Sequence, residues 1–222
     1  MYVPDEGTAS ETLADFYGEY AIARLLADDR ARKVGEGLQK AQEGLRKADD
    51  EERAAARSAT RALAVRDAAD ARLDAAVRDL WLEARRLSGN KNEAPLMKAL
   101  FPTGLNPIIR ASTEDEPVRV GSLLKAVEEA GRKELTALVP GVVSAKDGFV
   151  RQAKAHADAE AAHDQAFAAE RVRRLDWIRA YTGVYGTLVE MLGSKSEADD
   201  FFRSPGRRSR AAVTQPPGEK GA

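Results

Sequence analysis

The chain has 222 residues, with 35 basic and 36 acidic side chains, a formal net charge of −1 and only 6% aromatic residues. A chain of this length can bury a core without metals or disulfides, and its balanced charge gives no overall attraction to nucleic acid or anionic lipid. Because it contains no cysteine, thiolate catalysis and cysteine-ligated zinc or iron–sulfur sites are excluded.

The N-terminal segment MYVPDEGTAS lacks the basic start and the apolar stretch of a signal peptide. No apolar run approaches the roughly 18–20 residues of a membrane-spanning helix, so we expect a cytoplasmic protein. Two long stretches, 5–94 and 141–204, contain no proline, and no segment alternates as a strand does. The sequence therefore predicts an all-α protein.

The first predicted helix begins near Thr8 and carries apolar residues at intervals of three and four, as on a helix that faces a partner. Gly35 and Gly37 interrupt this pattern, so we place the first hairpin turn at 35–37, before a long helix that ends near Ser88. An alternative places the turn near 49–52. We prefer the earlier position because 46–61 contains no turn residues.

The sequence GNKNEA at 89–94 recurs as GSKSEA at 193–198, an offset of 104 residues. The same offset superposes apolar residues from position 37 to position 94, which predicts an internal duplication. The alternative is two unrelated amphipathic helices with a common end signal. The superposed residues include Leu45 with Phe149, Leu63 with Phe167, Leu73 with Trp177, Val77 with Tyr181, and Trp81 with Tyr185.

The repeated hexapeptide has the chemistry of a helix end followed by a new start. Gly89 and Gly193 can adopt the left-handed conformation that closes a helix, and Asn90 and Ser194 can cap the next one. We expect each short second helix, here called a hook helix, to end near residues 100–102 or 201–202. The large apolar residues there should pack back onto the long helix.

The second copy is predicted to contain a helix at 118–138, a break at Pro140 and Gly141, and a long helix at 142–192. The predicted fold is an elongated antiparallel helical bundle of two tandem helical hairpins. Its parts are a first hairpin with its hook helix at 8–102, a connector at 103–117, a second hairpin with its hook helix at 118–202, and a disordered basic tail at 203–222.

The only histidines lie on one predicted helical face with a carboxylate, as His156, Glu160 and His163. Glu160 and His163 have the spacing that ferritin-like di-iron bundles use, but such sites need matching carboxylates on other helices. The offset places Ala56 and Ala59 at the equivalent positions, so no second motif exists. We interpret the three residues as a solvated face and expect no metal or cofactor.

Four aromatic residues, Trp81, Trp177, Tyr181 and Tyr185, occur late in the two long helices. We interpret them as core where the long helices cross, and the alternative is a binding patch for a partner. Arg207, Arg208 and Arg210 make the tail basic, and they either bind an acidic partner or nucleic acid or serve solubility alone.

No P-loop, dinucleotide-binding glycine motif, nucleophile elbow or HExxH motif is present, so we do not expect an enzyme. The leading hypothesis is a structural, scaffolding or protein-interaction module that self-associates. The alternative is a regulatory or adaptor protein that binds an acidic partner or nucleic acid through its basic tail, and a metal-binding bundle is the least favoured. The sequence does not identify the partner.

Overall fold

A computed structural model describes residues 1–203, and every regular element within them is a helix, which confirms the all-α prediction for this part of the chain. No helix of the described part is long and apolar enough to cross a membrane. In chain order the elements are the π-helix η1 (Thr12–Gly18), α1 (Glu19–Ala27), α2 (Arg32–Leu87), α3 (Pro95–Leu100), α4 (Asn106–Ile109), α5 (Asp115–Ala130), α6 (Lys133–Thr136), α7 (Val139–Leu192) and α8 (Lys195–Asp199).

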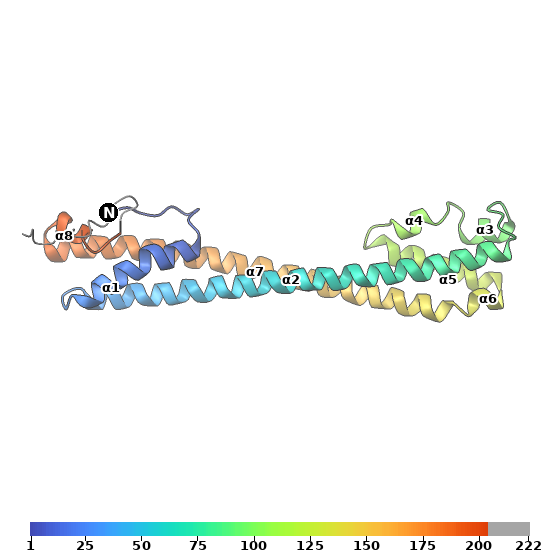
Figure 1. Cartoon of the computed structure of the whole chain (residues 1–222), viewed down its shortest axis with the longest axis horizontal. Helices are drawn as coiled ribbons and strands as arrows, with labels where there is room; N and C mark the ends of the chain where they lie inside the picture. The colour runs from blue at the N-terminus through green and yellow to red at the C-terminus, as the bar shows by residue number, and fades with distance from the viewer. Residues whose placement is uncertain (204–222) are drawn as a thin grey trace, which may run out of the picture. The chain divides into compact units, whose positions relative to one another are not determined.

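The chain divides into two compact units, and the long helices α2 and α7 contribute to both. Unit 1 contains Met1–Glu52 and the described residues from Ala166 onward, and unit 2 contains Arg53–Gln165. In unit 1, η1 and α1 lie beside the first part of α2, and α8 follows the end of α7 (Figure 1). In unit 2, α3 to α6 gather around the second part of α2 and the first part of α7 (Figure 1).

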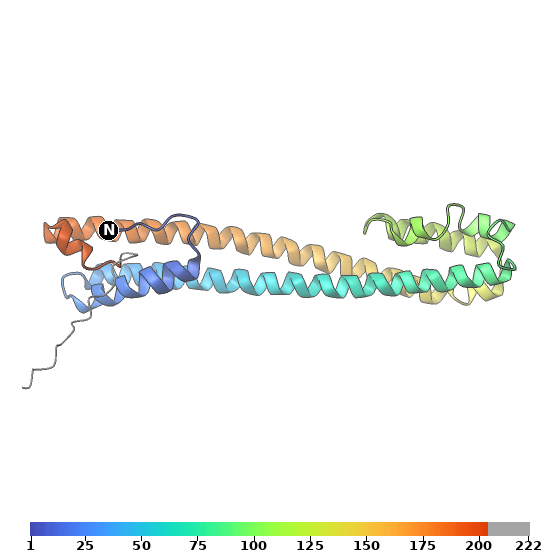
Figure 2. The same ribbon diagram turned by 45° about the horizontal axis from the view of Figure 1, so that its top comes forward.

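The core of unit 1 combines aliphatic residues with a cluster of aromatic rings. Tyr181 stacks on Trp177 with ring centroids 4.9 Å apart and meets the edge of Phe202 at 5.0 Å. The N-terminal segment passes along α7 before it enters η1 (Figure 2). It is held there by the amino group of Met1, 2.5 Å from Oδ1 of Asp199.

The core of unit 2 is largely aliphatic. It lies where α5 and the hook helix α3 pack on the second part of α2 and the first part of α7. Its buried apolar residues are Ala69, Leu73, Val77, Leu80, Ala84, Met97, Leu100, Phe101, Val120, Leu123, Val127, Leu135, Val142 and Phe149. Each unit therefore has a core of its own.

The predicted turn at Gly35 and Gly37 is wrong, and so is the alternative near 49–52, because both lie inside α2. The chain turns between α1 and α2, where the carboxylate of Asp28 accepts a hydrogen bond from the backbone amide of Arg30 at 2.9 Å. A Cβ atom at Gly35 would lie 2.8 Å from the Cβ of Leu25. This glycine therefore serves the close approach of α1 to α2.

The second predicted break is close to its observed place. Pro140 is the second residue of α7, within the first turn, where a missing amide hydrogen costs no helical hydrogen bond. The helix predicted at 118–138 is divided, because α5 ends at Gly131 in the left-handed conformation (φ 63°) and α6 follows. The expected connector 103–117 contains α4 and the first residues of α5.

The interpretation of the repeated hexapeptide is confirmed in part. Gly89 and Gly193 are left-handed, with φ of 62° and 67°, and the Ser194 hydroxyl accepts a hydrogen bond from the Glu197 amide at 3.3 Å. The predicted cap at Asn90 is wrong, because Asn90 is itself left-handed (φ 61°) and the turn continues. The hook helix α3 starts only at Pro95, whose fixed φ suits a first helical residue.

Candidate functional site

Three of the four aromatic residues singled out in the sequence lie in unit 1. Trp177 and Tyr181 are fully buried in its core, and Tyr185 is half-buried with its ring 5.7 Å from that of Phe202. Burial raises the pKa of the Tyr181 phenol. These side chains pack inside the unit, so they offer a partner little surface.

The histidine face in unit 2 does not have the geometry of a metal site. His156 is 8% exposed, its Nδ1 lies 3.4 Å from Nη1 of Arg66, and its Nε2 lies 3.5 Å from a carboxylate oxygen of Glu160. His163 is half-buried on the same helix. Across residues 1–203, no group of three or more histidine and acidic side chains is arranged to hold a metal ion.

The tail arginines of the adaptor hypothesis, Arg207, Arg208 and Arg210, lie outside the described residues. Before them, the guanidinium of Arg203 lies over the ring of Phe16, 4.0 Å from its centroid. This cation–π contact joins the start of the tail to η1.

The fourth aromatic residue, Trp81 of α2, is half-buried and lines a pocket in unit 2. The pocket has a volume of about 480 Å³, within the range of about 300–1,000 Å³ found for ligand sites. We call it the Trp81 pocket. It is lined by Trp81, Asn92, Glu93, Met97, Lys98, Phe101, Pro102, Gly104 and Leu105.

One ion pair and one further cation lie at the Trp81 pocket. Nζ of Lys98 lies 2.7 Å from Oε2 of Glu93, and this hydrogen bond and the ammonium charge lower the pKa of the Glu93 carboxyl. The guanidinium of Arg85 lies over the Trp81 ring, 5.2 Å from its centroid. The pocket therefore combines aromatic and aliphatic side chains with a neutral amide, Asn92, and one closed ion pair.

A second hollow of unit 2, here called the arginine groove, lies between α2 and α7 and has a volume of about 420 Å³. Arg72 and Arg151 line it, and neither guanidinium has a hydrogen bond or ion pair with any described residue. The remaining lining residues are small or uncharged, namely Val65, Ala69, Gly141, Ser144, Ala145, Gly148 and Gln152. This groove is positive and contains no acidic residue.

Two glutamates, Glu116 in unit 2 and Glu170 in unit 1, are each only 2% exposed and have opposite electrostatic surroundings. Burial alone would raise the pKa of Glu170, but hydrogen bonds from Arg174 and Ser10 and the guanidinium charge lower it. Burial, a side-chain hydrogen bond with Asp70 and the negative charges of Asp70 and Asp74 raise the pKa of Glu116 to about 8.

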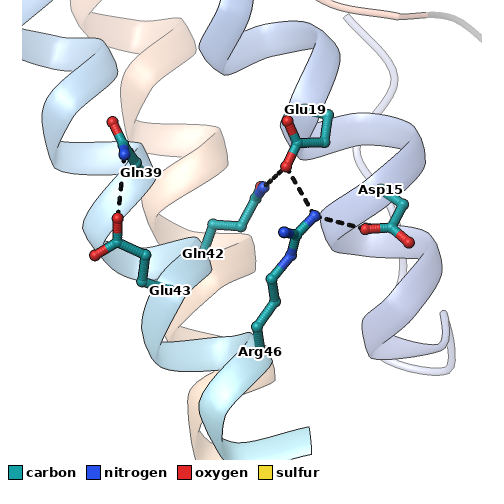
Figure 3. A network of polar contacts seen from close by, with 6 residues as sticks. All are labelled: Asp15, Glu19, Gln39, Gln42, Glu43 and Arg46. Carbon is teal, nitrogen blue, oxygen red and sulfur yellow. Dashed lines mark hydrogen bonds and ion pairs between the residues drawn. The ribbon is translucent and has the colours of Figure 1, made fainter. Parts of the chain in front are cut away.

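A polar network ties the N-terminal helices to α2 (Figure 3). The Gln42 amide donates to Glu19 at 2.8 Å, and Arg46 donates to Asp15 and Glu19 at 2.7 Å each. A Cβ atom at Gly18 would lie 1.8 Å from Oε1 of Gln42, so only glycine leaves room for this side chain. The network holds the wide π-helical turn against α2, and its charged side chains pair with one another. We therefore assign it a structural role.

The middle stretches of the long helices are almost unburied. In unit 2, residues 53–68 of α2 contain no buried side chain, and residues 150–165 of α7 contain only His156. Leu63 in unit 2 and Phe167 in unit 1 are 36% and 52% exposed. Neither residue belongs to the hydrophobic core of its unit.

No protein-family model matches the chain, and no curated protein or solved structure shows significant similarity to it. The candidate sites rest on geometry alone. Trp81 could be singled out from the sequence as an aromatic residue late in a long helix. The arginine groove and the Glu116 cluster could not, because their residues are far apart in the sequence and meet only through helix packing.

Proposed function

We propose that this chain is a non-enzymatic scaffolding or protein-interaction module that self-associates through the middle stretches of its long helices. The observation that carries the proposal is the near absence of buried side chains at 53–68 and 150–165, within continuous helices. Helices in proteins owe most of their stability to packing of one face, and these stretches have little packing within their own unit. A second copy would supply it.

The exposed pair Leu63 and Phe167 supports this seam. The two residues are 104 positions apart, as in the proposed duplication, and both are exposed. Six other apolar pairs at this spacing, between positions 37 and 94, are buried at both positions. Those pairs are Leu38 with Val142, Leu45 with Phe149, Leu73 with Trp177, Val77 with Tyr181, Leu80 with Val184, and Ala84 with Leu188.

The shared burial of these pairs also supports a proposal on architecture: the chain arose as two tandem, antiparallel helical hairpins. Each compact unit then combines the first part of one copy with the last part of the other. The repeated helix-closing glycines, Gly89 and Gly193, fit the same origin because both have left-handed backbones.

The test of self-association is the double variant Leu63→Glu, Phe167→Glu. Light scattering after size exclusion, over a hundredfold range of protein concentration, should give a defined oligomer for the wild type and the 24.0 kDa monomer for the variant. Glutamate has a good helix propensity, so the helices should still form. Its charge is costly to bury, so the contact between two copies should be lost. The control Val118→Glu, at a 67% exposed position of α5, should keep the wild-type mass. A wild type that stays monomeric throughout contradicts the proposal.

The second candidate function, binding of an acidic partner, is favoured by the arginine groove. Two guanidiniums without internal partners offer bidentate hydrogen bonds to carboxylates, and the small lining residues let a helix approach closely.

We expect the double variant Arg72→Glu, Arg151→Glu to weaken binding of a fluorescent helical peptide rich in glutamate by at least about tenfold at low salt. Arg110→Glu, Arg132→Glu makes the same change in charge at two exposed positions of unit 2 that lie outside the groove and outside the stretches 53–68 and 150–165. Fluorescence anisotropy measures the binding. If both double variants lose the same affinity for the peptide, the groove has no specific role and the net charge of the protein alone explains the binding.

A further inference from the structure

The Trp81 pocket has a filled counterpart in the same molecule. In unit 1, Tyr185 stands at the position 104 residues after Trp81, and Phe202 stands 104 residues after Lys98. The ring of Phe202 packs edge-on against both Tyr181 and Tyr185, and Phe202 is only 6% exposed. Unit 1 therefore covers its late aromatic residue with a phenylalanine of its own.

In unit 2 the hook residue Phe101 lines the same pocket as Trp81 but makes no aromatic ring contact with it, and the guanidinium of Arg85 lies over the Trp81 ring. The Lys98 side chain is 62% exposed and pairs with Glu93, and no aromatic ring of the described chain stacks on Trp81. The result is the pocket of about 480 Å³, which Trp81 shares with Met97 and Phe101. Aromatic rings and a thioether are groups against which a further ring packs favourably.

The polar groups at the pocket narrow the choice of occupant. The lining residues carry no net charge, because Glu93 and Lys98 neutralise each other, and the Arg85 guanidinium over the Trp81 ring disfavours a cationic group. The Asn92 amide lines the pocket and makes no hydrogen bond or ion pair with any described residue, so it is free to bond to a peptide group.

We propose that the Trp81 pocket is a binding site for an uncharged aromatic side chain of a partner protein, packed on Trp81 with its peptide group hydrogen-bonded to Asn92. This inference goes beyond self-association, because the pocket contains neither Leu63 nor Phe167. An aromatic residue buried in a pocket is a common energetic centre of protein interfaces.

The probe for this site is N-acetyl-L-phenylalanine methylamide, a single capped residue, followed through the indole N–H resonances of the full-length protein. The chain has two tryptophans, and Trp177 is buried in unit 1, so its resonance serves as an internal control. The Trp81 resonance should shift with a millimolar dissociation constant, and the Trp177 resonance should stay unchanged. The matching alanine derivative, which lacks the ring, should produce no comparable shift.

Lys98→Phe should place a ring at the pocket mouth and weaken probe binding at least about tenfold, whereas Lys98→Ala should stay within about twofold of the wild type. Lys98 is exposed, so both variants are expected to fold. Three outcomes would overturn the proposal: no shift of the Trp81 resonance, an equal shift with the alanine derivative, or unchanged binding to Lys98→Phe. None of them bears on self-association through Leu63 and Phe167.

Discussion

Glu116→Gln is expected to raise the free energy of unfolding at pH 8 and above, and to remove a fall in stability that the wild type shows between about pH 5 and pH 8. Glu116 is 2% exposed, and its Oε1 has no hydrogen-bond partner among the described residues. Glutamine has the shape of a protonated glutamate and can still donate a hydrogen bond towards Asp70. It therefore retains the neutral form that the folded protein prefers.

The sign of the pH dependence follows from the two pKa values of Glu116. The pKa is about 8 in the folded protein and about 4.3 in an unfolded chain. Between these values the folded state holds a proton that the unfolded state has released, so the free energy of unfolding falls by up to about 1.4 kcal/mol per pH unit. Below about pH 4 both states are protonated and this contribution is constant.

Urea unfolding followed by circular dichroism at a series of pH values measures the effect. The difference between Glu116→Gln and wild type should grow with pH and reach at least about 2 kcal/mol at pH 8.5. Glu128→Gln, an exposed position on the same helix, should follow the wild type at every pH. A constant difference between Glu116→Gln and wild type would mean that Glu116 does not titrate in this range.

The cores and the closing glycines were predictable from the sequence, because apolar spacing and left-handed glycines are local patterns. Trp177, Tyr181, Leu73 and Val77 are buried, as their spacing indicates. The turn at 35–37 was not predictable, because a glycine that admits Leu25 of a neighbouring helix looks the same in sequence as a glycine that turns the chain.

The candidate sites were less predictable than the cores. Glu116 looks like one more acidic residue of a helix start, and only the packing of α5 on α2 brings it to Asp70. Arg174 stands 104 residues after Asp70, so the same position of the proposed repeat holds a cation in one copy and a carboxylate in the other. A cation therefore lies beside one buried acid and a carboxylate beside the other, in addition to the burial that acts to raise the pKa of both.

The second large effect is expected at that cation. Arg174→Met should lower the free energy of unfolding by about 3–5 kcal/mol at neutral pH, because removal of one partner leaves a buried carboxylate without its counter-charge. Glu170 is 2% exposed, and one of its oxygens lies 2.5 Å from Nη2 of Arg174. Methionine retains much of the length and apolar character of the arginine stem, so the lost packing is small.

Two further measurements separate charge from packing. In the wild type the lowered pKa of Glu170 adds stability that is present above its unfolded value near 4.3 and is lost as the pH falls through the folded value. The cost of Arg174→Met should therefore shrink towards acidic pH, opposite in sense to the effect at Glu116.

Arg179→Met, which removes an exposed ion pair with Asp176, should cost at most about 1 kcal/mol. If Arg174→Met costs no more than this control, the buried pair does not contribute to the stability of unit 1. The alternative result is that Arg174→Met costs several times more than Arg179→Met, and that adding Glu170→Gln to Arg174→Met restores part of the lost stability. The arginine is then needed to balance the buried charge of Glu170, and not to stabilise the helix around it.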